Sequence, residues 1–348
     1  MNKISVAMTT YNGEKYIEKQ LLSMINQRRK VDEVIIHDDC STDKTVEIIS
    51  KFIKSHKLSG WKVIVNSENL GFVKNFYKSI SETTGNIIFL SDQDDIWDDN
   101  KVSEIERIFD ENEDALAVNT SFRFIDSNDN EIFSTEKKNT CNNRLIFRKL
   151  PRNSINKISE LEVLRSNISP GCTIAFTDSL KDYYIDHASF IIPHDLEINI
   201  YAARLGGLYF YNKCLMKYRI HNMNTIGLQV MNSSSILSQV KRVLKNRKNA
   251  MKILDGQLKL AKFFDTHYIT PDAKANKYMK KFIKYVRLRE KELVKGHFLR
   301  WFRSWLYYPY LRPNISAIKI VEDLVYAMRL DKLFLKMFDK KSSKFKIM

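Results

Sequence analysis

The sequence predicts an α/β protein, in which a mostly parallel sheet is flanked by helices and followed by a basic α-helical C-terminal extension. Short apolar runs alternate with segments of helical periodicity over roughly the first 100 residues, which is typical of parallel βαβ units. Polar motifs follow several of these runs, at the positions where ligands of such sheets bind. The last third of the chain is helical in pattern and strongly basic.

Each strand is assigned to a short continuous apolar run, and each helix to apolar residues that recur at helical spacing. In the first part of the chain, strands are expected at residues 4–8, 34–36, 61–66 and 87–90, and helices at 14–26, 45–54 and 75–82. Residues 113–190 carry weaker signals. A helix is expected at 194–205, ended by Gly206 and Gly207, and a strand at 208–211.

The charge distribution predicts a domain boundary. Residues 235–348 carry about 28 Lys and Arg against about 9 Asp and Glu, whereas the rest of the chain is slightly acidic. We therefore expect one domain at residues 1–232 and a basic helical region at 233–348. The first domain divides into two halves, about 1–100 and about 101–232.

The basic region has two helical stretches, one from residue 234 and one at 272–295, followed by an aromatic and basic segment at 298–308. The simplest interpretation is that the apolar stripes pack into a core and the basic faces are solvated. Basic amphipathic helices with Trp, Phe and Tyr also suit an anionic membrane surface, which we favour. No nucleic-acid-binding motif is present, so nucleic acid is not an expected partner.

Composition places the chain among ordinary globular proteins. Hydrophobic residues make up 44% and charged residues 28% of the 348 residues, which argues against wholesale disorder. No secretory signal opens the chain, and no apolar run reaches the roughly 18 residues of a spanning helix. The four cysteines are far apart and form no C-x-x-C pair, so neither a zinc site nor a disulfide framework is indicated. These features predict a cytoplasmic location.

The strongest chemical signal is the acidic cluster Asp92, Asp94 and Asp95 at the end of an apolar strand. Carboxylates this close repel one another unless a cation neutralises them. Mg²⁺ or Mn²⁺ binds carboxylates together with substrate phosphate oxygens. The alternative is a solvated acidic turn, or caps for a following helix.

Two further motifs follow other strands. Asp38 and Asp39 end the second strand, where a carboxylate can accept hydrogen bonds from a nucleotide base; the alternative is helix capping, since Ser41 and Asp43 follow. Residues 9–12 end the first strand, where main-chain amides and Tyr11 can meet a nucleotide. The alternative there is a polar turn.

Several segments, in this order and spacing, resemble one known family. They are Val6-Ala7-Met8-Thr9-Thr10-Tyr11-Asn12, Val34-Ile35-Ile36-His37-Asp38-Asp39-Cys40-Ser41-Thr42-Asp43, Asn69-Leu70-Gly71, Ser91-Asp92-Gln93-Asp94-Asp95-Ile96-Trp97, His194-Asp195 and Tyr218-Arg219-Ile220-His221 with Asn224 and Gly227. The chain resembles glycosyltransferase family 2, and the last of these segments its rhamnosyltransferase-like branch. The resemblance covers roughly residues 3–228 and implies a GT-A fold, which is Rossmann-like, and an inverting mechanism. It also implies that about 1–100 is the nucleotide-binding half and about 101–232 the acceptor half.

The resemblance also implies roles for individual residues. Asp195 would be the general base, and the metal ligands would be Asp94, Asp95 and His221. The nucleotide-sugar would be held by Thr9, Tyr11, Asn12, Asp38, Asp39, Asn69, Gly71, Asp92 and Arg219. One departure is Cys40, where the family more often has Gly or another small residue. Because Cys is small, little consequence is expected.

The predicted function is transfer of a sugar from a UDP- or dTDP-sugar to a hydroxyl of a glycan or lipid-linked saccharide, with Mg²⁺ or Mn²⁺ as cofactor. The enzyme would act in cell-surface polysaccharide synthesis, at the inner face of the cell membrane. Two alternatives remain at this point. One is a non-catalytic sugar-nucleotide-binding or scaffold protein of the same fold, and the other is a nucleic-acid-binding protein that uses the basic tail.

Overall fold

The structure is a computed structural model that describes residues 2–133, 141–143, 145–221, 247–295, 306–307 and 328. The chain forms two compact units, Met1–Met231 and Asn232–Met348. The point of division at residues 231 and 232 falls outside the described residues.

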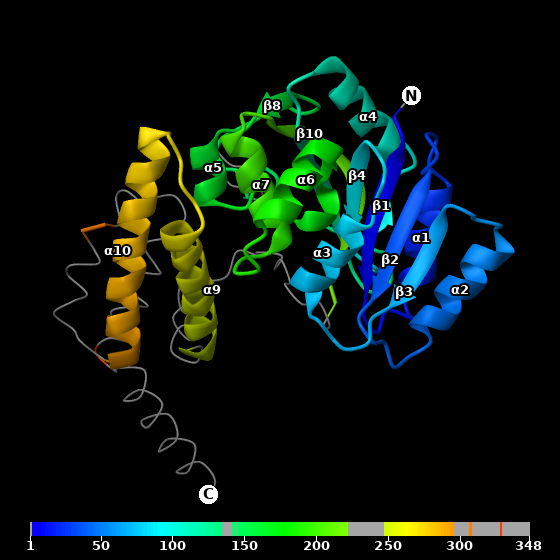
Figure 1. Ribbon diagram of the computed structural model, residues 1–348, viewed down its shortest axis with the longest axis horizontal. Helices are drawn as coiled ribbons and strands as arrows, with labels where there is room; N and C mark the ends of the chain where they lie inside the picture. The colour runs from blue at the N-terminus through cyan, green and yellow to red at the C-terminus, as the bar shows by residue number, and fades with distance from the viewer. Residues whose placement is uncertain are drawn as a thin grey trace, which may run out of the picture. The chain divides into compact units, whose positions relative to one another are not determined.

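The first unit is built on a mixed sheet (Figure 1). Its strands in the described residues are β1 (Ile4–Thr10), β2 (Glu33–Asp38), β3 (Trp61–Val65), β4 (Ile87–Ser91), β5 (Ile96–Trp97), β6 (Ala117–Ile125), β7 (Glu131–Ile132), β8 (Ile155–Lys157), β9 (Ala175–Thr177) and β10 (Leu208–Arg219). The order is β3-β2-β1-β4-β9-β6-β10-β5, with β7 beside β6 and β8 beside β10. Strands β3, β2, β1 and β4 are parallel, so their carboxyl ends lie at one edge of the sheet.

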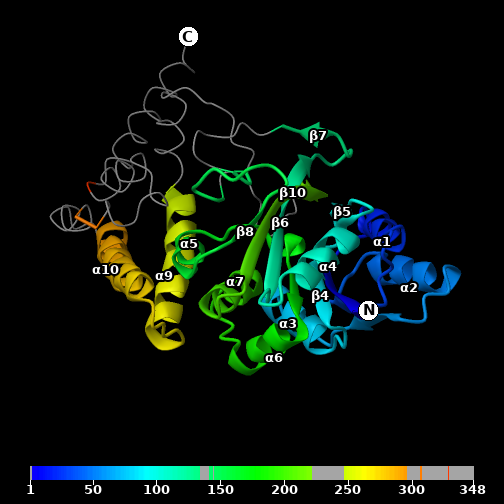
Figure 2. The same cartoon turned by 90° about the horizontal axis from the view of Figure 1, so that it is seen from above.

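Helices cover both faces of this sheet (Figures 1 and 2). They are α1 (Ile17–Ile25), α2 (Thr45–Ser55), α3 (Phe72–Ser81), α4 (Lys101–Glu111), α5 (Glu160–Arg165), α6 (Asp178–His187) and α7 (His194–Arg204), with a 3₁₀ turn at Gly171–Thr173. Helices α1, α2 and α4 share one hydrophobic cluster with β1, β2 and β4. Helices α3, α6 and α7 contact one another on the other face. Right-handed crossovers in a sheet of this order require that separation.

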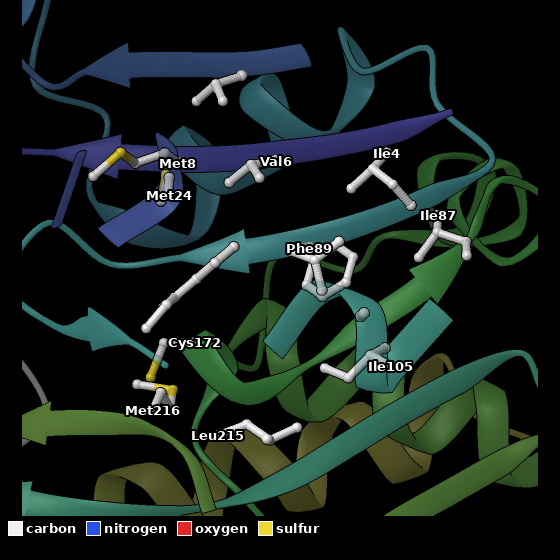
Figure 3. Packing of buried hydrophobic residues seen from close by; sticks show 14 of the residues in the cluster. Ile4, Val6, Met8, Met24, Ile87, Phe89, Ile105, Cys172, Leu215 and Met216 are labelled. Atoms are coloured by element: carbon white, nitrogen blue, oxygen red, sulfur yellow. The ribbon is translucent and has the colours of Figure 1, made fainter. Parts of the chain in front are cut away.

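Alternation along the strands explains the core. Ile4 and Val6 of β1 and Phe89 of β4 lie on the same face, toward Ile105 of α4 (Figure 3). All four side chains are completely buried. Burying side chains of this kind stabilises a fold by about 1.5–3 kcal/mol each, so this packing fixes the strand ends that carry the polar motifs.

The predicted fold class is confirmed, although several elements differ from the sequence prediction. Helix α4 and strand β6 were not predicted. Strand β10 extends to Arg219, well beyond the expected 208–211, and its register with β6 shifts twice, between Tyr211 and Cys214 and between Cys214 and Lys217. These irregularities interrupt the apolar alternation from which a strand is recognised.

The second unit contains helices α9 (Arg247–Thr266) and α10 (Ala273–Lys295), which pack against each other. Their shared core includes Leu254, Phe263, Phe264, Tyr278, Phe282 and Val286. The expected helix start at residue 234 and most of the aromatic segment 298–308 lie outside the described residues. None of the described helices combines the length and the hydropathy needed to cross a membrane.

Candidate active site

The turn after β1 is tied to the acidic loop after β4. Oε1 of Gln93 accepts a hydrogen bond from the Tyr11 main-chain N–H at 2.8 Å, and its Nε2 donates to the Tyr11 carbonyl at 3.0 Å. A Cβ atom at Gly13 would lie 2.2 Å from Gln93 Oε1, so a larger residue there would displace the Gln93 side chain from this position. The Tyr11 side chain is 50% exposed at this edge. The loops assigned to nucleotide and metal are therefore joined.

Asn12 joins the same turn to the loop after β2. Its φ of 49° lies in the left-handed region, which Asn tolerates better than most residues. Its Oδ1 accepts from the Thr42 main-chain N–H at 2.8 Å, and its own N–H donates to Ser41 Oγ at 2.8 Å. Thr9 lies within β1 and is partly buried. Of these residues, Tyr11 and Asn12 present exposed groups to a ligand.

Asp38 is completely buried and fully hydrogen-bonded by its own loops. Its Oδ2 accepts from Thr10 Oγ1 at 2.7 Å and from Ser41 Oγ at 2.6 Å, and its Oδ1 accepts from the Ser41 main-chain N–H at 2.7 Å. These are contacts within the loop and not the helix capping that was the alternative, because the N-cap of α2 is Lys44 and that helix has no side-chain cap. In this arrangement Asp38 supports the loop from inside.

Asp39 organises the start of α3. Its Oδ1 accepts from the Leu70 main-chain N–H at 2.7 Å and from Asn66 Nδ2 at 3.0 Å, and its Oδ2 accepts from the Gly71 N–H at 2.9 Å. Asn69 Nδ2 donates to the Asp39 carbonyl at 3.0 Å. Gly71 is the N-cap of α3 with φ 75°, a conformation that favours glycine. The structure therefore brings Asp39, Asn69 and Gly71 together, as their motifs predicted.

The acidic loop after β4 is different, because one buried carboxylate oxygen, Oδ2 of Asp95, is left without a hydrogen-bond partner in the described residues. Asp95 is 1% exposed, and its Oδ2 accepts no hydrogen bond from a nitrogen or oxygen donor in the described part of the chain. Burial, and then the charge of Asp94, raises the pKa of Asp95 to about 7. Burial also raises the pKa of Asp92 well above its usual range, followed by the charges of Asp95, Asp94 and Asp195.

Cys172 and Lys101 lie directly behind this loop. Carboxylate oxygens of Asp92 and Asp95 and the Cys172 Sγ atom lie within 4.8 Å of one another. Lys101 Nζ donates to the Cys172 carbonyl at 2.7 Å and lies 4.2 Å from the centroid of the Trp97 ring. Burial lowers the pKa of Lys101 to about 8, although the nearby carboxylates act in the opposite direction. No sequence motif indicated either residue.

Arg219 holds the acidic loop from within. The residue is completely buried, and its Nε donates to the Asp94 carbonyl at 2.7 Å. Its main-chain N–H donates to Asp95 Oδ1 at 3.1 Å, and its Nη1 donates to the Asp126 carbonyl at 3.0 Å and forms an ion pair with Asp129. These contacts favour a positioning role for Arg219 over the direct nucleotide-sugar contact expected from the sequence.

His221 lies beside Asp94, with Nε2 at 2.7 Å from Asp94 Oδ2. Its ring centroid is 5.0 Å from that of Tyr16. The predicted metal ligands Asp94, Asp95 and His221 therefore lie in one region, which also contains Asp92. Residues 224 and 227 of the same motif lie outside the described residues.

Asp195 approaches this cluster from α7. The N-cap of that helix is Pro193, so Asp195 lies in the first turn and is not the capping residue. Its Oδ2 accepts from Asn167 Nδ2 at 2.8 Å. A Cβ atom at Gly171 would lie 3.1 Å from the Asp195 Cβ atom, so glycine allows a close approach beside Cys172. The adjoining His194 ring stacks on Phe76, and burial lowers its pKa to about 4.

The donor groups of the acidic loop fit a hard divalent cation. A buried carboxylate oxygen without a partner is costly, and a bound cation removes that cost. Mg²⁺ and Mn²⁺ prefer carboxylate, water and phosphate oxygens, which Asp92, Asp94 and Asp95 supply in part. Burial and the neighbouring carboxylates raise the pKa of the Cys172 thiol, so it remains protonated and is a poor ligand for these ions.

The sequence of this chain is similar to known glycosyltransferases. Residues 5–181 match the family model described as Glycosyl transferase family 2. An uncharacterized glycosyltransferase of Haemophilus influenzae is 24% identical over 253 residues, 69% of this chain and 72% of the relative. The dTDP-rhamnosyl transferase RfbG of Shigella flexneri is 28% identical over 238 residues, 64% of this chain and 74% of the relative.

The sheet and its helices also resemble a solved structure. The crystal structure of Staphylococcus aureus TarS residues 1–349 in complex with UDP-GlcNAc has a TM-score of 0.50 at 18% identity. The match covers 94% of this chain and 90% of that chain. At this identity the likeness shows a shared fold, which is the GT-A arrangement expected from the sequence.

Proposed function

This chain belongs to glycosyl transferase family 2, and from that premise we propose that it catalyses inverting, metal-dependent transfer of a sugar from a nucleotide-sugar to an acceptor hydroxyl. The observation that carries the proposal is the acidic loop at residues 92–95, in which Asp95 is buried and Asp92 and Asp94 are half-buried. Oδ2 of Asp95 is buried without a partner in the described residues, and the charge of Asp195 acts on Asp92. A cation site alone would also suit a non-catalytic binding protein, so the Asp195 carboxylate near it is the feature that favours transfer.

Donor binding is assigned to the edge formed by the loops after β1 and β2. Tyr11 and Asn12 are exposed there and are proposed to contact the base and ribose. Thr9, Asp39, Asn69 and Gly71 shape the same edge, and Asp92 is proposed to reach the sugar-phosphate. Asp38 and Arg219 act through these residues, because both are completely buried in contacts with protein groups.

The proposed metal ligands are Asp94, Asp95 and His221, with Asp92 beside them. When bound, the cation would neutralise charge on the departing diphosphate. Arg219 holds the main chain of the acidic loop through its bond to the Asp94 carbonyl, so the carboxylates keep one geometry. His221 restrains Asp94 through its 2.7 Å contact.

Asp195 is proposed as the general base. It takes the proton of the acceptor hydroxyl while that oxygen forms a bond to the anomeric carbon. The bond between that carbon and the diphosphate oxygen breaks on the opposite side, so the configuration inverts. The diphosphate leaves with the electron pair, and no covalent enzyme intermediate is needed.

A donor screen tests this proposal. Purified full-length protein is mixed with a panel of UDP-, dTDP- and GDP-sugars, Mn²⁺ and octyl glycosides, and nucleoside diphosphate release is measured. Turnover should appear with at least one donor. Asp195→Asn should reduce transfer by roughly 100-fold or more, the usual scale for loss of a general base. UDP or dTDP affinity, measured by calorimetry, should not change. Absence of turnover across the panel would remove the enzymatic proposal.

The donor and acceptor classes are a finer proposal. RfbG is named a dTDP-rhamnosyl transferase, which supports a dTDP-deoxyhexose as donor, with a UDP-sugar as the second candidate. We propose a glycan or lipid-linked saccharide as acceptor, in cell-surface polysaccharide synthesis. In the screen, a clear preference for dTDP-rhamnose over UDP-sugars supports the first donor, and the reverse preference supports the second.

We further propose that the second unit binds the anionic inner face of the cell membrane. One face of α10 carries a stripe of exposed cations at helical spacing: Lys274, Lys277, Lys280, Lys284, Arg287 and Lys291. The stripe runs for about 26 Å at ~1.5 Å per residue. Of these cations, Arg287 is paired with an acid, Asp265, at 2.7 Å.

The last part of this stripe borders a cavity of about 500 Å³, lined by Lys284, Arg287, Leu288, Lys291, Leu306 and Tyr307. Cations beside apolar and aromatic side chains suit the boundary between lipid headgroups and acyl chains. The arrangement supports a surface contact with anionic phospholipid.

Vesicle binding tests this surface. The full chain should bind phosphatidylserine vesicles and be released at high salt, because the Debye length shrinks to about 3 Å at 1 M. Lys277, Lys280 and Lys284→Glu should abolish binding, whereas the same charge change at Lys252, Lys259 and Lys262 of α9 should leave most of it. Equal binding to neutral vesicles, or tight binding to duplex DNA in preference to vesicles, would overturn the membrane assignment.

A further inference from the structure

A row of three asparagine side chains lies behind Asp195. Asn119 comes from β6, Asn167 from the loop after α5, and Asn199 from α7, four residues after Asp195. Asn119 and Asn199 are completely buried. The three amides come from separate segments and form a chain that ends at the carboxylate that we assign as the base, although none of them belongs to a sequence motif.

The hydrogen bonds fix the direction of each amide. Asn119 Nδ2 donates to Asn199 Oδ1 at 2.7 Å, and Asn199 Nδ2 donates to Asn167 Oδ1 at 3.2 Å. The oxygen of Asn167 is therefore engaged on the Asn199 side, and its Nδ2 donates to Asp195 Oδ2 at 2.8 Å. Reversing the Asn167 amide would face its NH₂ group toward that of Asn199 and its oxygen toward the carboxylate, which is unfavourable at both ends.

The main chain around Asn167 is held as firmly as its side chain. Asn142 Nδ2 donates to the Ile168 carbonyl at 2.7 Å, and Ser169 Oγ donates to the Thr120 carbonyl at 2.8 Å. Thr173 Oγ1 donates to Ser169 Oγ at 2.7 Å. These groups are buried, so each bond lacks competition from water. The loop presents the Asn167 amide at a defined position.

We propose that Asn167 is a positioning residue for the transfer reaction, which orients Asp195 and is itself oriented by Asn199 and Asn119. This inference rests on the proposed function, in which Asp195 is the base. A donor on Oδ2 fixes the rotation of the carboxylate. In the described residues Oδ1 accepts no hydrogen bond, so it is the oxygen that receives the proton of the acceptor hydroxyl. That proton moves to Oδ1 as the new glycosidic bond forms and the diphosphate leaves.

The test is a double-substitution cycle in the full chain, with octyl glycosides as acceptor probes and the donor found in the screen. Asn167→Ala should lower kcat by roughly 10- to 100-fold, the effect of a misplaced reacting group. UDP or dTDP affinity should stay within about 2-fold of wild type, because the donor edge is untouched. In an Asp195→Asn background, Asn167→Ala should cause no further loss, since its effect acts through Asp195.

Asn167→Asp gives a second, isosteric variant that preserves packing. It replaces the donor by a carboxylate facing Asp195, so it should lower kcat at least as much as alanine does. Asn156→Ala is the matched control, because Asn156 is equally half-buried in the same unit and bonds to Ser154. It should leave kcat unchanged.

The outcomes separate the two proposals. Normal transfer by Asp195→Asn removes the base and with it the proposed mechanism. Loss of transfer by Asp195→Asn together with normal kcat for both Asn167 variants overturns the positioning role alone. An equal loss from Asn167→Ala in both backgrounds also overturns it, because a purely structural effect is additive.

Discussion

Two acidic pairs lie at the carboxyl edge of the same sheet, and they differ in how many of their carboxylate oxygens accept hydrogen bonds from the protein. Asp38 and Asp39, after β2, are 0% and 4% exposed, and their carboxylate oxygens accept hydrogen bonds from protein donors at 2.6–3.0 Å. Asp95, after β4, is 1% exposed and has an oxygen without a partner, and burial raises its pKa to about 7. Burial likewise raises the pKa of Asp92.

This difference in hydrogen bonding distinguishes carboxylates that stabilise the fold from a carboxylate that is left for a ligand. Burying an ionised carboxylate without donors costs several kcal/mol, and hydrogen bonds from main-chain amides offset that cost. The hydrogen bonds of the first pair are therefore complete without a ligand. Asp95 Oδ2 has no partner in the described residues, and the proposed cation is a ligand whose chemistry would complete it. Similar acidic motifs after β2 and β4, the two strands that flank β1, thus differ in their hydrogen bonds.

Removal of the metal by chelation should give the largest effect, which is loss of transfer activity. If the acidic loop at 92–95 needs a cation, EDTA should abolish transfer, and added Mn²⁺ or Mg²⁺ should restore it. Diphosphate release before and after metal addition is the measurement. Asp94→Asn should show low turnover at every metal concentration while its thermal midpoint stays near wild type. Full activity in EDTA would mean that the unpaired oxygen of Asp95 serves another purpose.

In the metal-free protein, the pH dependence of stability should report the raised pKa of Asp95. The pKa of Asp95 is raised from 3.8 to about 7, so the folded state binds more protons than the unfolded state between these values. Stability must then fall as pH rises from about 4 to about 7, by on the order of 4 kcal/mol. His194, whose pKa is lowered to about 4, opposes this trend up to pH ~6.5. The comparison must therefore be wild type against Asp95→Asn.

Denaturant unfolding in EDTA at pH 5 and pH 8 provides the measurement. The advantage of Asp95→Asn over wild type should be small at pH 5 and larger at pH 8, and excess Mn²⁺ should remove it. An advantage that is equal at both values would show that Asp95 ionises normally in the folded protein.

The same isosteric substitution should have opposite effects in the two pairs. Asp39→Asn places an NH₂ group against a main-chain N–H of Leu70 or Gly71, so it should destabilise the protein by about 2 kcal/mol. Asp95→Asn removes an unpaired charge and should leave the metal-free protein as stable as wild type or more so. Denaturation midpoints at pH 8 in EDTA compare them. Equal destabilisation by both variants would contradict the distinction between the pairs.

The sequence predicted this edge of the molecule well, because its signals are local. Each motif follows a continuous apolar strand, so Asp39, Gly71 and Asp92 could be placed at one edge from the βαβ pattern. The same pattern did not reveal which carboxylates accept hydrogen bonds from protein donors on all their oxygens. That difference depends on donors from other segments, such as the main-chain N–H of Gly71 for Asp39.

The acceptor half was predicted less well for a related reason. Strand β6 contains the buried polar run Asn119-Thr120-Ser121, which interrupts the apolar pattern. Those residues tolerate burial because of distant partners, such as Asn199 for Asn119 and Asn142 for Ser121. Lys101 behind the acidic loop likewise depends on tertiary contacts. A local sequence pattern does not identify a residue whose role depends on contacts with residues that are distant in sequence.

Substitution of Cys40 tests whether the loop that contains Asp38 and Asp39 is rigid, and it has the smallest expected effect on stability. The sequence predicted little consequence from Cys at a position where the family favours smaller residues, but its φ is 65°, in the left-handed region. That conformation costs a non-glycine residue about 1–2 kcal/mol, whereas glycine loses roughly 0.5–1 kcal/mol more backbone entropy on folding. The thiol also donates to the Asn66 carbonyl at 3.1 Å, so removing it has its own cost.

Comparing Cys40→Gly with Cys40→Ala cancels the loss of the thiol, because both variants lack it. Glycine should be the more stable by about 0.5–1 kcal/mol, measured as the difference in denaturation midpoint at equal slope. The reason is that Asp39, next to Cys40, is held on both oxygens and does not let the main chain relax to a negative φ. If alanine were as stable as glycine, the loop would be free to adjust. Asp38 and Asp39 would then not form the fixed edge on which the contrast with Asp92 and Asp95 depends.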